Sequence, residues 1–315
     1  MNIGIVGAGL TGPGIAVTLA KSNHDVLLYS RSPGRLREAK AKIKLAISLL
    51  SKHHLVSPQD TILDRIGYTN DLEKFARCNW IIESIPEIFD EKLALFRKLE
   101  QITKSNTMLS TNTSGLSVTK LAEGITRRKM FLGTHFWVPT HLTPLVEIIA
   151  TKYVDDAVTH TICETLESCG KKPVLLRSDI PGFVGNRLQY AMIREALAIV
   201  QRGAASPAEV DSIVKYGFGL RLPVIGPFET MDIAGIDTVS KVGGYLFADL
   251  ENGNVVPQIV NEKVSKGELG LKTQKGFYIW NKEKIEKTLT KRDEELAARL
   301  LTLKNSKPSS QKRRR

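Results

Sequence analysis

The 315-residue chain contains few cysteines, few aromatic residues and no long hydrophobic run. Its three cysteines, Cys78, Cys163 and Cys169, are odd in number and lack the spacing of metal ligands. We therefore expect no disulfide framework and no metal site, and a reducing, cytoplasmic location is favoured. Charged residues interrupt the apolar stretches, so the sequence predicts no membrane span. Met1 leads directly into an apolar run, which predicts no targeting segment.

Acidic residues are also scarce relative to basic ones. The chain has 33 Asp and Glu against 45 Lys and Arg, a formal net charge of +12. Six of the basic residues lie between Lys304 and Arg315, where there is no acid. This polar composition predicts a disordered basic tail over residues 301–315. The remaining positive charge suits an anionic small molecule such as a phosphate-bearing cofactor, and we expect no nucleic-acid partner.

A glycine-rich loop follows the first apolar run. Residues 2–7 have the pattern of a buried strand, and residues 7–12 read GAGLTG, after which a helical pattern begins. In such a loop Gly7 permits a tight turn, Gly9 lets backbone approach a pyrophosphate, and Gly12 lets helix and strand pack closely. Leu10 and Thr11 complete the loop. A second strand pattern at 25–29 follows, so the order strand, glycine loop, helix, strand predicts a dinucleotide-binding site.

The residues after the second strand bear on the choice of cofactor. A site selective for NAD usually places Asp or Glu there to bind the ribose 2′-hydroxyl. This chain instead has Ser30 and Arg31, with Arg35 close behind. A carboxylate would repel a 2′-phosphate, whereas a hydroxyl and a guanidinium bind one, so we favour NADP over NAD. The alternative is that Arg31 only stacks on the adenine and the site accepts either cofactor.

Strand and helix patterns alternate up to about residue 182 and then give way to amphipathic helical patterns. We predict an α/β fold with a Rossmann-like dinucleotide-binding domain over residues 1–182. A helical hairpin is expected to interrupt this domain near residues 36–70. An all-helical C-terminal domain is expected over residues 183–300.

His135 and Glu147 are the strongest candidates for chemistry. They lie 12 residues apart, each in a short apolar run, and a Pro-bounded connection separates the two runs. If the runs form adjacent strands, the carboxylate lies against the imidazole. A carboxylate that holds one ring nitrogen orients the His and stabilises its protonated form, as a general base requires. The alternative is a buried structural His beside an edge-strand Glu.

The combination of motifs resembles the L-3-hydroxyacyl-CoA dehydrogenase family over roughly residues 1–280. Besides the glycine loop, the matching motifs are Glu83 and Glu87 in ESIPE, Asn112-Thr113-Ser114, His135 and Pro139 in HFWVP, Leu145-Val146-Glu147, Pro181-Gly182-Phe183, Asn186-Arg187, Gly226-Pro227-Phe228, Lys272-Thr273 and Gly276-Phe277-Tyr278. The resemblance implies a Rossmann-like domain followed by a helical domain for dimerisation and substrate binding, and it implies a homodimer.

The resemblance also implies roles for individual residues. His135 matches the family's catalytic base and Glu147 its carboxylate partner. Ser114 and Asn186 match residues that hold the substrate oxygen, and Glu87, Lys92 and Lys272 match residues near the cofactor. The implied activity is the NAD(P)-dependent interconversion of the 3-hydroxyl and 3-keto groups of an L-3-hydroxyacyl-CoA, as in fatty acid metabolism.

The sequence departs from the family pattern at several positions. Trp137 and Val138 replace the usual Phe and Asn of HFFNP, and Gln274 replaces a Gly. Ala46 and His53 stand roughly where Ser and Lys commonly touch coenzyme A. Related branches oxidise carnitine, gulonate or a hydroxymethylpyridine carboxylate without coenzyme A, and two segments near residues 222–253 look somewhat like the last of these. A substrate that is not linked to coenzyme A is therefore the alternative.

Overall fold

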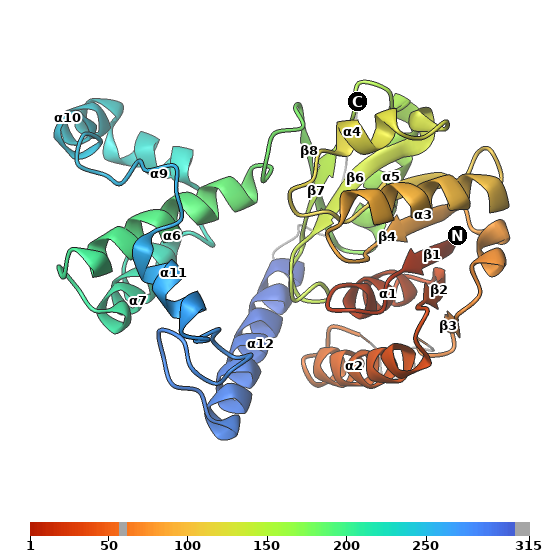
Figure 1. Cartoon of the computed structure of the whole chain (residues 1–315), viewed down its shortest axis with the longest axis horizontal. Coiled ribbons are helices and arrows are strands. Elements are labelled where there is room, and N and C mark those ends of the chain that lie inside the picture. Colours follow the sequence, from red (N-terminus) through yellow and green to blue (C-terminus); the bar gives the residue numbers. More distant parts are fainter. Residues whose placement is uncertain (57–61, 306–315) are drawn as a thin grey trace. The chain divides into compact units, whose positions relative to one another are not determined.

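The computed structural model describes residues 1–56 and 62–305, which divide into two compact units (Figure 1). The first unit contains Met1–Val184 together with the described residues from Thr288 onward, and the second contains Gly185–Lys287. The first is a Rossmann-like α/β unit and the second is helical, so the predicted fold class is confirmed.

An eight-stranded sheet with the order β3-β2-β1-β4-β5-β6-β7-β8 forms the centre of the first unit. All neighbouring strands are parallel except β6 and β7, which are antiparallel. The strands are β1 (Asn2–Val6), β2 (Asp25–Tyr29), β3 (Ile66–Thr69), β4 (Trp80–Glu83), β5 (Met108–Thr111), β6 (Phe131–Phe136), β7 (Leu145–Ile149) and β8 (Lys172–Leu176). Most of the strand residues are buried, as expected for a parallel sheet covered on both faces.

Helices cover both faces of the sheet. They are α1 (Gly12–Ala20), α2 (Pro33–Lys52), α3 (Phe89–Ile102), α4 (Val118–Glu123) and α5 (Asp156–Ser168), with short 3₁₀ helices η1 (Leu72–Arg77) and η2 (Arg128–Met130). Alternate strand residues enter two separate cores. Ile3, Ile5 and Trp80 pack with α1, α2 and α5, whereas Val6 and Ile81 pack with α3 and α4.

The register of the strands aligns their carboxyl ends. Val6 is paired with both Tyr29 and Glu83, and Glu83 is paired with Thr111. The residues that follow β1, β2, β4 and β5 therefore emerge along one edge of the sheet. In open α/β sheets this edge is where ligands bind.

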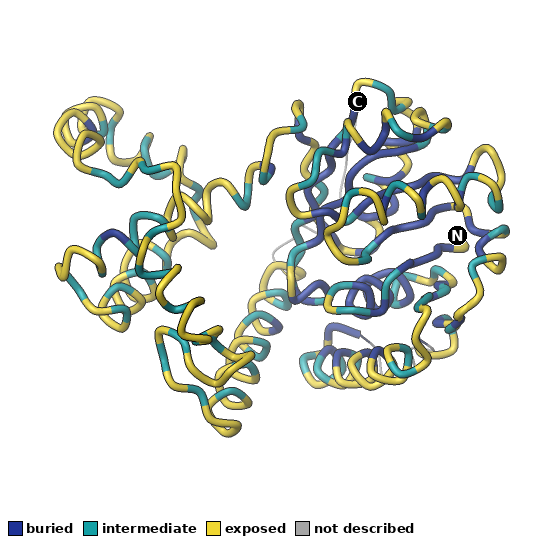
Figure 2. Tube along the Cα trace, viewed as in Figure 1, coloured by how far each residue is buried: buried dark blue, intermediate teal, exposed yellow. Residues whose placement is uncertain are grey.

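The second unit consists of helices and turns. Its helices are α6 (Gly185–Gln201), α7 (Pro207–Tyr216), α8 (Phe218–Arg221), α9 (Pro227–Ala234), α10 (Ile236–Leu246), α11 (Gln258–Ser265) and the first turns of α12 (Lys282–Asn305). Ser206 forms a capping box with Glu209 at the start of α7. Figure 2 shows that most of this unit is exposed, whereas the strands of the first unit are buried.

Three predictions about the architecture differ from the structure. No helical hairpin interrupts the sheet among the described residues near 36–70, because α2 is one continuous helix and residues 66–69 form strand β3; residues 57–61 lie outside the described range. The helical unit ends at Lys287, not at residue 300. Residues 301–305, predicted as disordered tail, belong to α12, and residues 306–315 lie outside the described range.

The second half of α12 packs on α2. Ala297 is fully buried in the same core as Ala39, Ile43 and Ala46 of α2. Polar contacts support this packing, because Glu294 bonds Lys52 at 2.6 Å and the His53 Nε2 at 2.5 Å. Within the described ranges, no helix is long and apolar enough to span a membrane.

Candidate active site

The glycine loop has the geometry that its sequence predicts. Gly7 has φ = +126°, and a Cβ there would lie 2.2 Å from the Ser84 carbonyl oxygen. A Cβ on Gly12 would lie 1.9 Å from the Gly7 carbonyl oxygen. Only glycine satisfies these two positions. A Cβ on Gly9 would meet no atom within 4 Å, so this residue leaves space for a ligand.

The loop forms one wall of a cleft of about 790 Å³. Its lining comes from the carboxyl ends of β1, β2, β4 and β5 and from helix α2: Gly7, Ala8, Gly9, Leu10, Thr11, Tyr29, Ser30, Arg31, Ser32, Arg35, Lys42, Ser84, Ile85, Pro86, Glu87, Asn112 and Ser114. The first turn of α1 has no side-chain cap, so its N–H groups are suited to a phosphate. A dinucleotide fits these observations.

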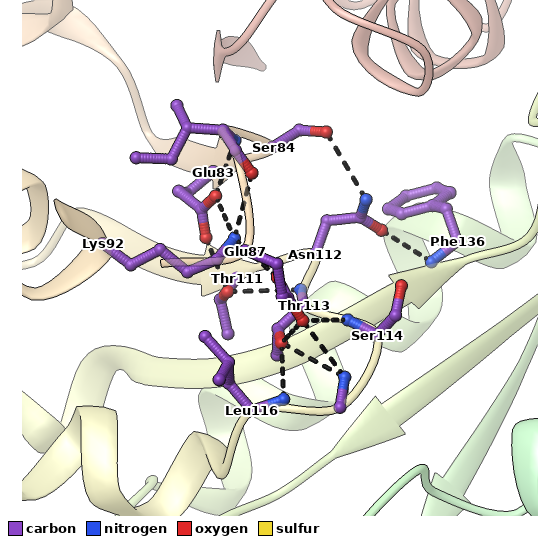
Figure 3. A network of polar contacts seen from close by, with 12 residues as sticks. Glu83, Ser84, Glu87, Lys92, Thr111, Asn112, Thr113, Ser114, Leu116 and Phe136 are labelled. Atoms are coloured by element: carbon purple, nitrogen blue, oxygen red, sulfur yellow. Dashed lines mark hydrogen bonds and ion pairs between the residues drawn. The ribbon is translucent and has the colours of Figure 1, made fainter. Parts of the chain in front are cut away.

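Figure 3 shows a buried ion pair, Glu83 with Lys92, next to the cleft-lining Glu87. The Lys92 ammonium is 2.5 Å from Glu83 Oε1 and 3.3 Å from Glu87 Oε2. Both Glu83 and Lys92 are almost fully buried, and the Thr111 hydroxyl donates to Glu83 at 2.6 Å. The placement of Lys92 near the cofactor remains a prediction: its ammonium is bonded to these carboxylates, and of the three residues only Glu87 lines the cleft. The sequence spacing of ESIPE and Lys92 did not reveal this pairing.

Glu87 holds the loop that carries Ser114. Its carboxylate accepts from the Thr113 hydroxyl, from the Ser114 amide at 2.9 Å and from the Gly115 amide at 3.2 Å. Partial burial raises the pKa of Glu87, but hydrogen bonds from Thr113 and Ser114 and the charge of Lys92 outweigh it, so that the net pKa is lowered. Ser114 is thus presented at the cleft by an ionised carboxylate.

Asn112 joins the cleft to the strand that carries His135. Its side-chain oxygen accepts from the Phe136 amide at 2.8 Å, and its amide group donates to the Ser84 hydroxyl at 3.4 Å. The backbone after β4, the backbone after β5 and the end of β6 are therefore tied together. This bridging role was not predicted, although Asn112 directly follows a strand, where a polar side chain is a useful signal.

His135 and Glu147 are in contact, as predicted. Strands β6 and β7 pair His135 directly with Glu147, and the imidazole Nδ1 lies 2.8 Å from Glu147 Oε2. Both side chains are nearly fully buried. A carboxylate partner requires the proton to be on Nδ1, which leaves Nε2 to exchange a proton with a ligand.

Two aromatic rings and one backbone amide complete the surroundings of this pair. Ring centroids of Trp137 and Phe183 lie 5.5 and 5.4 Å from that of His135. The Val184 amide donates to Glu147 Oε1 at 3.1 Å, and the Trp137 indole N–H donates to Oε2 at 3.2 Å. The residues at 183–184 are distant in sequence, and only the motif PGF indicated their importance. Val138, which replaces an Asn, is 46% exposed beside the pair.

His141, six residues after His135, is a second buried histidine in this region, but it occupies a different environment. Burial lowers its pKa to about 4, partly offset by Asp293 of α12, so it is neutral at physiological pH. The adjacent Lys171 ammonium donates to the Thr140 carbonyl and, at 2.7 Å, to the Thr143 carbonyl. No sequence signal indicated Lys171.

Asn186 and Lys272 belong to the second unit. Asn186 lies in the first turn of α6, directly after the boundary at Val184, and Lys272 lies in a turn-rich segment before α12. Their predicted contacts with substrate and cofactor remain predictions. Among the residues that the structure describes, no cluster of three or more potential metal ligands is present.

A glycine-loop cleft beside a buried His–carboxylate pair is the arrangement expected of a dinucleotide-dependent oxidoreductase, and we place the protein in this class. Models of the 3-hydroxyacyl-CoA dehydrogenase NAD-binding domain and C-terminal domain match residues 2–180 and 182–280. The chain belongs to this family of NAD-dependent oxidoreductases that act on CH–OH groups. The family assignment, the enzyme class and NAD binding are thereby confirmed, whereas a preference for NADP remains a prediction.

Individual relatives differ in substrate. The chain is 36% identical over 280 residues to a probable 3-hydroxybutyryl-CoA dehydrogenase of Deinococcus radiodurans, covering 88% of this chain and 99% of the relative. It is 32% identical over 298 residues to a 5-formyl-3-hydroxy-2-methylpyridine 4-carboxylate 5-dehydrogenase of Mesorhizobium japonicum, covering 94% and 96%. A solved structure of a dehydrogenase for that pyridine compound, described as an NAD+-dependent dismutase, has a TM-score of 0.91 at 31% identity, covering 96% of this chain and 98% of the other.

Proposed function

We propose that the protein interconverts an alcohol and a carbonyl group, with His135 as general base and acid and Glu147 as its partner. The observation that carries this proposal is the 2.8 Å contact between Nδ1 and Glu147 Oε2, on a strand tied by Asn112 to the cofactor cleft. The dinucleotide, when bound, supplies the hydride acceptor or donor.

In the oxidation direction, Nε2 of His135 removes the hydroxyl proton, and Glu147 stabilises the imidazolium that forms. In reduction, the same nitrogen returns the proton to the oxygen. Ser114, presented by Glu87, and Asn186 are proposed to donate hydrogen bonds to the substrate oxygen as negative charge develops on it.

A preference for NADP is part of the proposal. Ser30, Arg31, Arg35 and Lys42 all line the cleft, and no acidic residue accompanies them at the end of β2. Lys42 was not predicted to take part; its ammonium lies 3.4 Å from the Gly9 carbonyl oxygen, beside the glycine loop. Three cationic side chains near the adenosine end favour a dianionic 2′-phosphate.

For the substrate, we propose an L-3-hydroxyacyl-CoA, in a step of fatty acid metabolism. The family assignment and the relative from Deinococcus radiodurans support this choice.

A substrate without coenzyme A is the second candidate. Ala46 and His53, the positions compared with coenzyme A contacts, face α12: Ala46 is 7% exposed, and His53 is bonded to Glu294. The similarity to a pyridine carboxylate dehydrogenase over 94% of the chain supports this candidate too.

One assay separates the candidates. The full chain is tested with both cofactors on 3-hydroxybutyryl-CoA, 3-hydroxybutyrate, carnitine and 5-formyl-3-hydroxy-2-methylpyridine 4-carboxylate. Turnover of the thioester alone supports the first candidate, and turnover of a free acid alone supports the second. His135→Gln should lower kcat by about 10²-fold or more on the substrate that is used.

The matched control is His160→Gln, because His160 is an exposed histidine on α5 that pairs with the neighbouring Glu164. It should leave kcat unchanged. If His135→Gln retained wild-type turnover, the assignment of the proton-transfer residue would be wrong.

A homodimer and a cytoplasmic location complete the proposal. The second unit carries many exposed apolar side chains, including Tyr216, Phe228 and Phe247, which suit burial against another copy. All three cysteines are unpaired, in keeping with a reducing compartment.

A further inference from the structure

One oxygen of Glu147 receives two N–H donors. Oε2 lies 2.8 Å from His135 Nδ1 and 3.2 Å from the indole Nε1 of Trp137, while Oε1 accepts from the Val184 amide. Trp137 thus donates a hydrogen bond to the same carboxylate that holds the His135 ring. Its ring also lies against the imidazole, with centroids 5.5 Å apart.

The shared oxygen weakens the attraction between Glu147 and a protonated His135. A hydrogen bond to a carboxylate draws negative charge toward its donor and stabilises the ionised acid. The same oxygen is then a poorer acceptor for Nδ1–H, and the imidazolium gains less from it. In a buried pair this effect is little screened by solvent.

We propose that Trp137 is a positioning residue that lowers the proton affinity of His135 by sharing the Glu147 oxygen to which Nδ1 donates. The inference rests on the proposed role of His135 in proton transfer. It gives a function to the Trp that replaces the usual Phe of the HFFNP motif. Glu147 on Nδ1 holds the imidazole in one tautomer, and Nε2 is left to exchange a proton.

Few other ionisable groups in the first unit lie on the elements packed against the pair. His135 and Glu147 are the only ionisable residues of β6 and β7, and β5 has none. Lys172 starts β8, where it is exposed and paired with Leu145. In the segment leading to Val184, Arg177 is exposed, and Asp179 accepts from the Ser117 hydroxyl and the Thr119 amide.

The test is a titration of His135 in the full chain without substrate. Proton–carbon NMR of histidine-labelled protein follows the six His rings, and the signal missing from His135→Gln identifies His135. Trp137→Phe removes the indole N–H but keeps an aromatic ring beside the imidazole. We expect the titration midpoint of His135 to rise by about half to one pH unit, the scale of one hydrogen bond.

Trp80→Phe is the matched control. The Trp80 indole donates to the Ser110 hydroxyl at 3.0 Å on neighbouring strands and does not contact Glu147, so its loss should leave the midpoint unchanged. Trp137→Leu is a second variant that lacks the N–H and should shift the midpoint in the same direction. An unchanged or lowered midpoint in the Trp137 variants overturns the inference.

Activity gives an independent reading. On a substrate that is turned over, the acid limb of the kcat/KM profile for oxidation should move to higher pH in Trp137→Phe by the same amount as the NMR midpoint. If the NMR midpoint moves but no alcohol or carbonyl substrate is turned over, the proposed function fails while the inference about Trp137 stands.

Discussion

Ser30 is the residue on which cofactor choice depends. It follows β2, where a site selective for NAD usually carries a carboxylate, and its hydroxyl accepts from the Ser32 amide at 3.3 Å. Ser32 in turn caps α2 by accepting from the Arg35 amide. The position that carries a carboxylate in NAD-selective sites is therefore held here by an uncharged serine, directly before the start of α2.

We predict that kcat/KM is higher with NADPH than with NADH. Ser30→Asp should lower the value for NADPH about tenfold or more, because a carboxylate repels the 2′-phosphate. Arg31→Gln should act in the same direction. Arg37→Gln, which removes an exposed charge from α2 outside the cleft lining, serves as the control. A wild-type preference for NADH would refute this interpretation of Ser30 and Arg31.

At the scale of elements, the connection between β6 and β7 depends on a residue from another part of the chain. Lys171, just before β8, donates to the Thr140 and Thr143 carbonyls of this connection and is 4% exposed. Burial, with the nearby charge of Lys21, lowers its pKa from 10.5 to about 7. The β6–β7 connection, which begins at Trp137, is thus held in place by the Lys171 amine, which is partly neutral near pH 7.

This anchoring predicts a pH dependence of stability. The folded pKa of Lys171 lies below the unfolded one, so unfolding takes up a proton between pH values of about 7 and 10.5. The stability that Lys171 contributes therefore rises as pH increases through this window. Relative to Lys171→Met, the free energy of unfolding of the wild type should therefore rise by on the order of 2–4 kcal/mol between pH values of about 7 and 10.5.

Urea unfolding of both proteins at a series of pH values measures this difference. Lys172→Met is the control, since Lys172 is exposed and adjacent in sequence. A difference between the wild type and Lys171→Met that stays constant with pH would show that Lys171 is charged in the folded protein.

At the scale of the whole molecule, the two units differ in how far they bury their apolar residues. The first unit has two cores around its sheet. In the second unit only Ala198 and Gly243 are buried among the described helices, whereas Phe228 and Phe247 are 77% and 70% exposed. A unit with so little buried apolar surface gains stability when another surface covers it.

We predict that the full chain sediments as a dimer at micromolar concentration. Phe228→Asp should raise the dissociation constant at least about 30-fold, because an interface related by a two-fold axis loses this contact twice. Leu45→Asp places the same charge on an equally exposed apolar residue of α2 in the first unit and should leave the dimer intact. A monomeric wild type would refute the dimer proposal.

Much of the fold and part of the site followed from local patterns. The glycine loop could be predicted because only glycine fits at two of its positions: Gly7 has a positive φ, and a Cβ at Gly7 or Gly12 would collide with a backbone carbonyl. The pairing of His135 with Glu147 could be predicted from the sequence, because a short connection between the two apolar runs limits how their strands align. The helical hairpin predicted near residues 36–70 is not found among the described residues of that region, where β3 is a four-residue strand without a strong alternating pattern.

The sequence by itself determined the dinucleotide-binding edge, the helical second unit and the two residues proposed for proton transfer, since each is encoded by neighbouring residues. Only the tertiary structure decided what surrounds them. Trp137 on Glu147, Lys92 between Glu83 and Glu87, and the return of α12 to the first unit are contacts between side chains on different elements. Such contacts depend on how the elements pack, which no local periodicity records.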